Sequence, residues 1–390
     1  MKKFKDKVIS LSDHWAQEQL DFLIELCHQN SYSLHKEGVD RVSAVIIENL
    51  AGILPVHEIK REKEFGDHHV LKNPAASAAK AIYLVGHMDT VFPPDHSFQK
   101  CRRADDLLTG PGTADMKGGL VVMVYALKIL KELGILDRLP LVMILNSDEE
   151  AGSVSSRELF LVEREKARLC LVAECSGLHN EIVVSRNGKM GARVRSFGQG
   201  RHVSHGAAHK SSAVLEMAHK IIALEGLNGS LPGVDINVGR VEGGLGSSTV
   251  PESASCLLDI RWQEGDRQKS LQNRLEAEIA APVLPGCRSE VEVLNSRPAM
   301  PENPHSRPLV QMAQELARTL GQEIGTEHRR GTSDANFFGA FAVPTLDGWG
   351  PIGDKDHTAE EFIKISSLQE RTALLSLFLL EYAGQAGMIP

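Results

Sequence analysis

The sequence has no excess of basic residues, no paired cysteine motif and no low-complexity segment. Its 390 residues include 43 Lys and Arg against 51 Asp and Glu, which gives a formal net charge of −8. Binding of nucleic acid as the main partner requires a basic surface, so this balance argues against it. The six cysteines are scattered without a CxxC pair. That distribution argues against a disulfide framework and a cysteine zinc site, and it is typical of reduced thiols.

Segments that target a protein to membranes are also missing. Residues 1–9 alternate lysines with single apolar residues and contain no apolar run typical of a signal peptide. The longest apolar runs, at 119–130 and 139–145, are much shorter than the roughly 20 residues that span a bilayer. We therefore expect a cytoplasmic protein with no membrane partner.

What the sequence does contain is an alternation of buried strands and helices. Two amphipathic helices are predicted at 12–27 and 40–50. A third helix is predicted at 116–133. Short apolar strands are predicted at 81–86, 139–145 and 169–173. Continuous apolar strands separated by helices indicate an α/β fold with a mainly parallel, mixed sheet and helices on both of its faces.

The pattern changes between residues 189 and 299. Here the predicted order is strand, helix, strand, strand, helix, strand, which is the order of a split βαβ, or ferredoxin-like, α+β domain. Alternation of helices and strands then resumes to the end of the chain. We therefore predict a larger domain made of residues 1–188 and 300–390, with the ferredoxin-like domain of residues 189–299 inserted into it.

Polar clusters follow the three apolar strands predicted in the larger domain. His87 and Asp89 follow the first strand, Glu149 and Glu150 follow the second, and Glu174 ends the third. Ligand sites in parallel sheets lie beyond the carboxyl ends of the strands. The sequence therefore predicts a functional site at this edge of the sheet.

Two further segments supply candidate metal ligands. Asp115 lies in GPGTADMKGG and His357 lies in DKDHTAEEF. Imidazole and carboxylate ligands without thiolate suit zinc in a catalytic site, with cobalt or manganese as substitutes. GPGTADMKGG is rich in glycine, but it lacks the GK[ST] that closes a phosphate-binding loop. The segment therefore favours a metal centre over a nucleotide site.

Together these motifs resemble the family of acetylornithine deacetylase, succinyl-diaminopimelate desuccinylase, aminoacylase and glutamate carboxypeptidase. GHMDTVFP resembles the first metal motif of that family, GPGTADMKGG its bridging-aspartate motif and NSDEEAGS its paired-glutamate motif. VPESASCLLDIRW, RPAM, RGTSDANF and a terminal histidine motif follow in the family's order. The resemblance covers nearly the whole chain and implies a zinc-exopeptidase-like fold. It is strongest to glutamate carboxypeptidase, because both DIRW and RPAM carry an arginine.

This resemblance implies a centre of two zinc ions. Asp115 would bridge the two ions, with His87 and Glu174 completing one site and Glu150 and His357 the other. Two metals a few ångström apart can hold a hydroxide between them and polarise the substrate carbonyl.

The resemblance also implies roles for residues that do not bind the metals. Glu149 would be the general base, and Asp89 would orient the imidazole of His87. The peptide bond between Asp115 and Met116 would be cis.

Substrate recognition would be mainly the work of the inserted domain. His202 or, with a gap in the alignment, His205 would reach into the active site of a partner subunit and stabilise the oxyanion. This role implies a homodimer formed through the inserted domain. The residues expected to bind substrate are His202, Ser248, Arg261, Arg297 and Gly331. The two arginines would grip a substrate carboxylate, although each could instead form a surface ion pair.

The resemblance implies a carboxypeptidase that releases a C-terminal amino acid such as glutamate from a small peptide or N-acyl amino acid. An N-acyl-amino-acid deacylase would use the same metals and base and differ in which side of the amide it recognises. A non-catalytic binding protein on this scaffold would lack a ligand or the base, and none is missing from the motifs. The sequence therefore favours an enzyme and leaves its substrate open.

Overall fold

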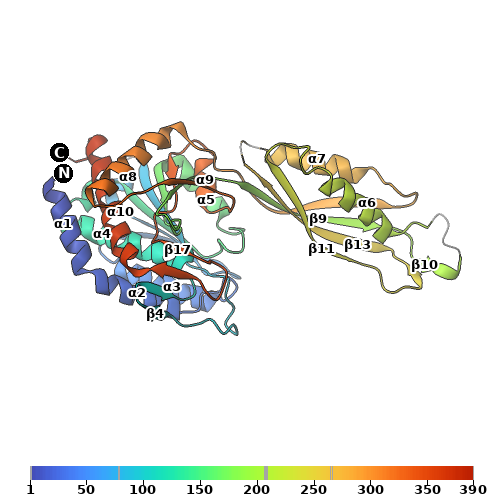
Figure 1. The fold of residues 1–390 in the computed structure, drawn as a ribbon, viewed down its shortest axis with the longest axis horizontal. Helices are drawn as coiled ribbons and strands as arrows, with labels where there is room; N and C mark the ends of the chain where they lie inside the picture. Colours follow the sequence, from blue (N-terminus) through green and yellow to red (C-terminus); the bar gives the residue numbers. More distant parts are fainter. Residues whose placement is uncertain (1, 78–79, 206–209, 264, 266, 390) are drawn as a thin grey trace. The chain divides into compact units, whose positions relative to one another are not determined.

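The protein consists of two compact units (Figure 1). The computed structural model describes residues 2–77, 80–205, 210–263, 265 and 267–389. Unit 1 contains Met1–Ser185, Glu302–Arg329 and Ser333–Pro390, and unit 2 contains Arg186–Pro301 and Arg330–Thr332. Unit 2 is therefore an insertion into unit 1, extended by three residues from a later segment. None of the helices in the described ranges has the length and apolar character that crossing a bilayer requires.

A six-stranded, mainly parallel sheet forms the centre of unit 1. Its strand order is β1-β2-β6-β3-β7-β16. β6, β3, β7 and β16 are parallel neighbours, whereas β1 and β2 form an antiparallel side. The strands are β1 (Val56–Lys60), β2 (His68–Lys72), β3 (Ala81–His87), β6 (Leu141–Asn146), β7 (Ala167–Val172) and β16 (Thr345–Leu346). The mainly parallel, mixed sheet predicted from the apolar runs is confirmed.

Helices cover both faces of this sheet. Ile82 and Leu84 of β3 belong to the large core that includes α4 and α10, whereas the ring of Tyr83 lies 5.7 Å from that of Phe338 in α9. Successive side chains of a strand point to opposite faces, so α4 and α9 lie on different sides of the sheet. The helices of unit 1 are α1 (Lys2–His14), α2 (Ala16–His28), α3 (Lys36–Asn49), α4 (Gly118–Glu132), α5 (Arg157–Glu163), α8 (Arg307–Thr319), α9 (Ala335–Gly339) and α10 (Ile365–Gln385).

Two predicted helices differ from the observed ones. The helix expected at 12–27 is two helices, α1 and α2, that meet at Trp15. The first residues were not predicted as helical because lysines separate their apolar residues. These apolar residues nevertheless have helical spacing, and one of them, Val8, is fully buried. The helix expected to begin at Met116 begins at Gly118 instead. A π-helical turn, Thr113–Lys117, precedes it, and the expected cis peptide bond between Asp115 and Met116 is confirmed.

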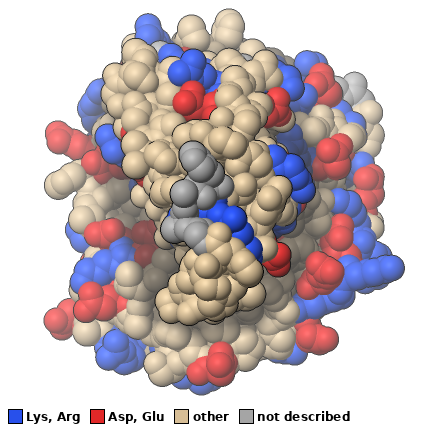
Figure 2. Space-filling model, turned by 90° about the vertical axis from the view of Figure 1, so that its right-hand side faces the viewer, with Lys and Arg blue, Asp and Glu red and all other residues tan. Residues whose placement is uncertain are grey.

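Unit 2 has the predicted ferredoxin-like order of elements. Its four-stranded antiparallel sheet has the order β11-β13-β9-β14, and α6 and α7 contribute buried residues to one shared core with these strands. The elements are β9 (Gly188–Phe197), α6 (Ala213–Glu225), β11 (Val234–Gly243), β13 (Ser253–Trp262), α7 (Gln268–Ala280) and β14 (Arg288–Arg297). On the face in Figure 2, acidic and basic side chains are interspersed, as the balance of the two charges in the sequence leads us to expect.

The remaining strands form small sheets. β10 (Arg201–His202) pairs with β12 (Thr249–Val250) in unit 2. β8 (Ile182–Arg186) pairs with β15 (Thr326–Arg329). The last small sheet contains β4 (Arg102–Ala104), β5 (Leu107–Thr109), β17 (Gly353–Asp354) and β18 (Phe362–Lys364).

Asp67 ties helix α3 to the connection between β1 and β2. Its carboxylate accepts hydrogen bonds from Lys36 at 2.7 Å, from the Glu62 amide at 3.0 Å and from Arg61. Its own amide donates to Asp40 of α3 at 2.8 Å. Burial alone would raise the pKa of Asp67, but the three hydrogen bonds lower it to about 2.

We predict that Asp67→Asn destabilises the protein in a pH-dependent way. A carboxylate whose folded pKa is depressed stabilises the fold above its unfolded pKa, and this contribution is lost as the pH falls through the folded pKa. With pKa values of about 2 folded and about 4 unfolded, the loss should be roughly 1–3 kcal/mol at pH 7 and about half as large at pH 3. Urea unfolding of both proteins at the two pH values measures the difference.

The exposed Asp13 provides the matched control. Asp13→Asn should shift the urea midpoint little at either pH, since exposed charges contribute little to stability. A pH-independent loss in Asp67→Asn would contradict the role assigned to its carboxylate.

Candidate metal centre

Three neighbouring parallel strands bring the predicted ligands to one edge of the central sheet. His87 is the last residue of β3, and Glu174 follows the end of β7. Glu150 lies in the loop that follows β6, the strand on the other side of β3. Asp115 comes from the π-helical turn before α4, and His357 from the loop between β17 and β18. The five residues predicted as metal ligands therefore come from five separate segments of unit 1.

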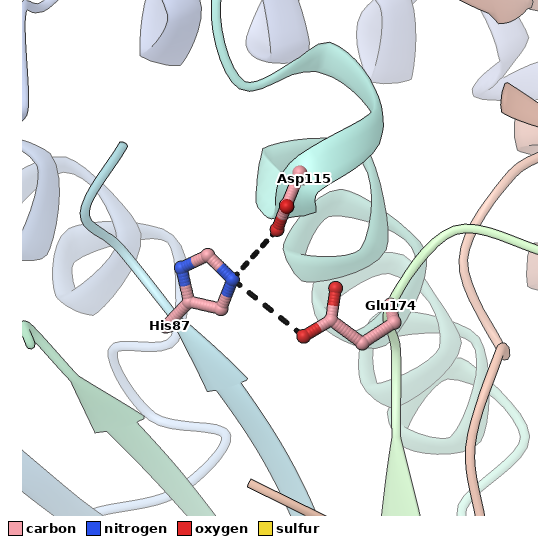
Figure 3. A group of neighbouring side chains, drawn as sticks. All are labelled: His87, Asp115 and Glu174. Carbon is pink, nitrogen blue, oxygen red and sulfur yellow. Dashed lines mark hydrogen bonds and ion pairs between the residues drawn. The ribbon is translucent and has the colours of Figure 1, made fainter. Parts of the chain in front are cut away.

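The first group of side chains contains His87, Asp115 and Glu174 (Figure 3). The Nε2 atom of His87 lies 2.9 Å from Asp115 Oδ1 and 3.6 Å from Glu174 Oε1. Potential ligand atoms of all three residues lie within 4.8 Å of one another. One imidazole nitrogen and two carboxylates therefore face a common point.

The second group contains Asp115 again, with Glu150 and His357. The Nε2 atom of His357 lies 3.4 Å from Asp115 Oδ2 and 3.0 Å from Glu150 Oε2. Asp115 therefore turns one carboxylate oxygen to each histidine, which is the arrangement of a bridging ligand. The His357 side chain is 52% exposed and that of His87 is 1% exposed, so solvent reaches the centre from the side of the second group.

Asp89 fixes the orientation of His87. The Nδ1 atom of His87 lies 3.1 Å from the Asp89 carbonyl oxygen and 3.4 Å from its carboxylate. A proton held on Nδ1 by these oxygens leaves the lone pair of Nε2 directed at Asp115 and Glu174. The buried Asp89 carboxylate also accepts hydrogen bonds from Ser33 Oγ at 2.6 Å and from the amides of residues 149 and 150 at 3.2 Å. One side chain therefore couples β3 to the loop that carries both glutamates.

Glu149 is placed differently from its neighbour Glu150. It lies at this same edge of the sheet and is buried, but it is not part of either group of potential ligands. Glu150 can therefore bind a metal ion while Glu149 stays available for another role.

The electrostatics of the two groups favour a bound cation. Burial, followed by the charge of Asp115, raises the pKa of Glu174 to about 8 and also raises that of Glu150. Hydrogen bonds to Asp115 and Glu150 raise the pKa of His357 to about 11. Protons therefore offset the crowded negative charge, and a divalent cation would do so more directly, while displacing those protons. The donor set of two imidazoles and three carboxylates fits zinc.

The predicted substrate-binding residues Arg261, Arg297 and Gly331 come together within unit 2. Arg297 Nη1 lies 3.4 Å from the hydroxyl oxygen of Thr332, and Arg261 donates to the carbonyl oxygen of residue 330 at 3.2 Å. The carbonyl oxygen of Gly331 accepts a hydrogen bond of 3.2 Å from Arg186. Arg261 also pairs with Asp259 at 2.8 Å, so the ion pair weighed from the sequence exists at this position.

His202 and Ser248 lie in another part of unit 2, at the small β10–β12 sheet. His202 is opposite Thr249, and the Ser248 carbonyl oxygen accepts a hydrogen bond from the amide of residue 203 at 3.0 Å. His202 and His205 are both exposed. The choice between these two histidines therefore stays open.

Glu361 is a functional candidate that sequence reasoning missed. Its buried carboxylate accepts hydrogen bonds from the backbone amides of Gly112 at 2.9 Å, Ala114 at 2.8 Å and Asp115 at 3.0 Å. It thereby holds the turn that presents the Asp115 side chain. The only sequence signal was its position four residues after His357 in DKDHTAEEF.

Comparison with known proteins agrees with this geometry. The profile described as peptidase family M20/M25/M40 matches residues 83–381, a range that includes all five potential ligands. The chain belongs to this peptidase family. The family resemblance inferred from the motifs is thereby confirmed, and the chain is a metallopeptidase or amidohydrolase. M20 peptidases depend on metal, in agreement with the two groups around Asp115.

Two relatives show the range of activities among similar sequences. Carboxypeptidase G2 of Pseudomonas sp. is 26% identical over 306 residues, which cover 77% of this chain and 74% of the relative. Succinyl-diaminopimelate desuccinylase of Marinobacter nauticus is 28% identical over 343 residues, which cover 81% and 87%. This M20 peptidase is thus similar both to a carboxypeptidase and to an enzyme that removes an acyl group.

Solved structures share the fold. Aminopeptidase PepT of Bacillus cereus matches with a TM-score of 0.75 and 21% identity, covering 94% of this chain and 99% of its own. The M20 metallo-carboxypeptidase Sso-CP2 of Sulfolobus solfataricus matches with a TM-score of 0.73 and 19% identity, covering 93% and 99%. The α/β fold with a ferredoxin-like insertion is therefore the fold of M20 peptidases.

We predict that Glu361→Ala weakens zinc binding by roughly 10- to 100-fold, the usual effect of removing a group that orients a metal ligand. The substitution leaves three buried amides without an acceptor and releases the turn that carries Asp115. Glu361→Gln should lose less, because it keeps one acceptor oxygen. Competition with a chromophoric chelator measures the affinity.

The neighbouring Glu360 is exposed and pairs with Lys355, so Glu360→Ala is the matched control and should bind zinc normally. Circular dichroism shows whether each variant is folded. Wild-type zinc affinity in a folded Glu361→Ala protein would disprove the positioning role.

Proposed function

We propose that this M20 peptidase is a di-zinc carboxypeptidase that cleaves an amide bond next to a free carboxylate. The observation that carries the proposal is the placement of Asp115 between two imidazole groups, one carboxylate oxygen facing each. In this proposal His87, Asp115 and Glu174 hold one ion, and Asp115, Glu150 and His357 hold the other. The two ions would supply an activated water at neutral pH and polarise the substrate carbonyl.

The residues of the chain divide the remaining work. Glu149 accepts a proton from the attacking water and later donates it to the leaving amine, which a carboxylate beside the centre can do. Asp89 keeps the Nε2 atom of His87 directed at the metal, because it holds the opposite ring nitrogen. Closely surrounding protein atoms limit the access of bulk water to the first group, since His87 is buried.

Substrate recognition is proposed for unit 2. Arg297 and Arg261 bind the free carboxylate of the substrate, because guanidinium groups bind carboxylates with two parallel hydrogen bonds. Gly331 and Ser248 line the binding site, and His202 stabilises the oxyanion from the partner subunit of a homodimer. The similarity to carboxypeptidase G2 supports glutamate as the residue released.

An N-acyl-amino-acid deacylase is the second candidate. The similarity to succinyl-diaminopimelate desuccinylase, over 81% of the chain, supports it. Both enzymes would use the same ions and the same base, so they differ in which fragment unit 2 binds. The six cysteines are free, which supports the further proposal that the enzyme acts in the reducing cytoplasm.

We predict that Glu149→Gln lowers kcat by at least about a hundredfold while zinc content stays normal, because the amide cannot accept the proton of the water. Turnover is measured on zinc-loaded protein, and zinc content by atomic absorption. The exposed Glu132 gives the matched control Glu132→Gln, which should keep wild-type turnover. Retained activity in Glu149→Gln would rule out this residue as the base.

The same assay chooses between the two candidates. We expect hydrolysis of a folate-like N-acyl glutamate and of dipeptides with a free C-terminal carboxylate, and loss of it when that carboxylate is an amide. Preferential hydrolysis of N-acetyl or N-succinyl amino acids would instead identify a deacylase. Stoichiometric zinc without turnover of any of these substrates would favour a non-catalytic binding protein.

A further inference from the structure

A basic pocket lies at the edge of the central sheet opposite the metal centre. Lys80 precedes β3, Arg164 lies in the turn before β7, Arg168 lies in β7, and Phe341 lies before β16. These side chains line a cavity of about 260 Å³ in unit 1. β3 and β7 begin at this basic pocket and end at the metal ligands. The seven residues of β3 separate the two places by roughly 20 Å at about 3.3 Å per residue.

The charge of the basic pocket is strongly positive. Lys80, Arg164 and Arg168 contribute three positive charges and Glu165 one negative charge. Glu165 is 74% exposed and lies 3.5 Å from Arg164, so water weakens this single ion pair. Within the described ranges, no carboxylate forms an ion pair with Lys80 or Arg168. The cavity wall therefore carries a net charge of about +2 in a protein whose formal net charge is −8.

Each of the two guanidinium groups lies over an aromatic ring. The Cζ atom of Arg164 lies 3.3 Å from the centroid of the Phe341 ring, and that of Arg168 lies 5.8 Å from the Tyr382 ring. Cation–π contact engages the flat face of a guanidinium and leaves the N–H donors at its edge. The ring contacts of both arginines therefore use none of their N–H donors.

One of these donors lacks an acceptor although it is buried. Arg164 Nη1 has no contact with solvent and no hydrogen-bond partner among the described residues. Leaving a buried charged donor unpaired costs free energy. An anion in the cavity would offset the positive charge of this guanidinium group, whereas Nη1 itself lies behind the cavity wall.

We propose that the basic pocket binds the phosphoryl group of a small phosphate monoester. A dianion matches the net charge of the cavity, and its several oxygens can accept from two guanidinium groups and one ammonium together. The cavity holds roughly nine water volumes at about 30 Å³ each, more than the four oxygens of a phosphate ion occupy. The remaining space accommodates the organic part of the ester. Binding here does not depend on the activity proposed for the metal centre.

Isothermal titration calorimetry on the full-length, zinc-loaded protein tests this site. Glycerol 3-phosphate, inorganic phosphate and succinate are titrated separately at constant ionic strength. Phosphate also coordinates zinc, so the informative quantity is the difference between the wild type and variants of the basic pocket. We expect Lys80→Met, Arg164→Met and Arg168→Met each to raise the Kd for glycerol 3-phosphate by about tenfold.

The variants are chosen to keep the fold. Lys80 is exposed, so Lys80→Met tests the charge without disturbing the core, and methionine at 164 can still pack on Phe341. Arg103 of β4 is exposed and distant from the basic pocket in the sequence, so Arg103→Met controls for the loss of one positive charge. This control should bind glycerol 3-phosphate like the wild type.

The titrations have three further informative outcomes. Equal Kd values for wild type and all three pocket variants would overturn it, because the binding would then lie elsewhere. Succinate binding that is as tight and as sensitive to the variants would overturn the phosphoryl assignment. Inorganic phosphate that binds as tightly as the ester, with the same sensitivity, would support phosphoryl recognition and identify free phosphate as the ligand.

Discussion

The structure depends above all on the position of one carboxylate, that of Asp115. Its two oxygens must face two different groups at once, each with one histidine and one glutamate. Asp115 sits in a π-helical turn with non-helical dihedral angles, before the regular helix α4 begins. Glu361 ties that turn to the segment of His357, which supplies a ligand to the second group. The ligand His357 and Glu361, which supports the turn of Asp115, therefore lie in the same loop between β17 and β18.

The concentration of charge around Asp115 explains why this site favours a bound cation. Burial and the charge of Asp115 raise the pKa of both Glu150 and Glu174, so in the absence of an ion the fold holds them by taking up protons. Protons and metal ions compete for the same oxygens and ring nitrogens, so metal affinity falls as the pH falls. The fold maintains an electrostatically unfavourable cluster because strong contacts elsewhere, such as the packing of α4 against the sheet, position it.

The sequence predicted the strands that carry an apolar run or an alternating pattern and missed strands that carry neither. β3 and β6 are buried at every residue, so their apolar runs and the polar residues after them could be recognised directly. β1 and β2 contain histidines, lysines and a glutamate, and no apolar run marks them. The role of Glu361 depends on backbone amides 246 or more positions away, which no local pattern reveals. The pair of Arg261 with Asp259 was predictable, because residues two apart on a strand share a face.

The two edges of the central sheet carry opposite charges, and this follows from how a parallel sheet is built. The parallel strands β6, β3, β7 and β16 all begin at one edge and end at the other, so the loops of the two edges can differ in composition without affecting each other. Here acidic ligands gather where β3 and β7 end, and basic residues gather where they begin. The strands between are buried, and they separate the two charges by roughly 20 Å. An anion at the basic edge would therefore add little to the repulsion that already exists among the carboxylates. The residues that bind ligands at the two edges can consequently change independently in evolution, although they lie on the same strands.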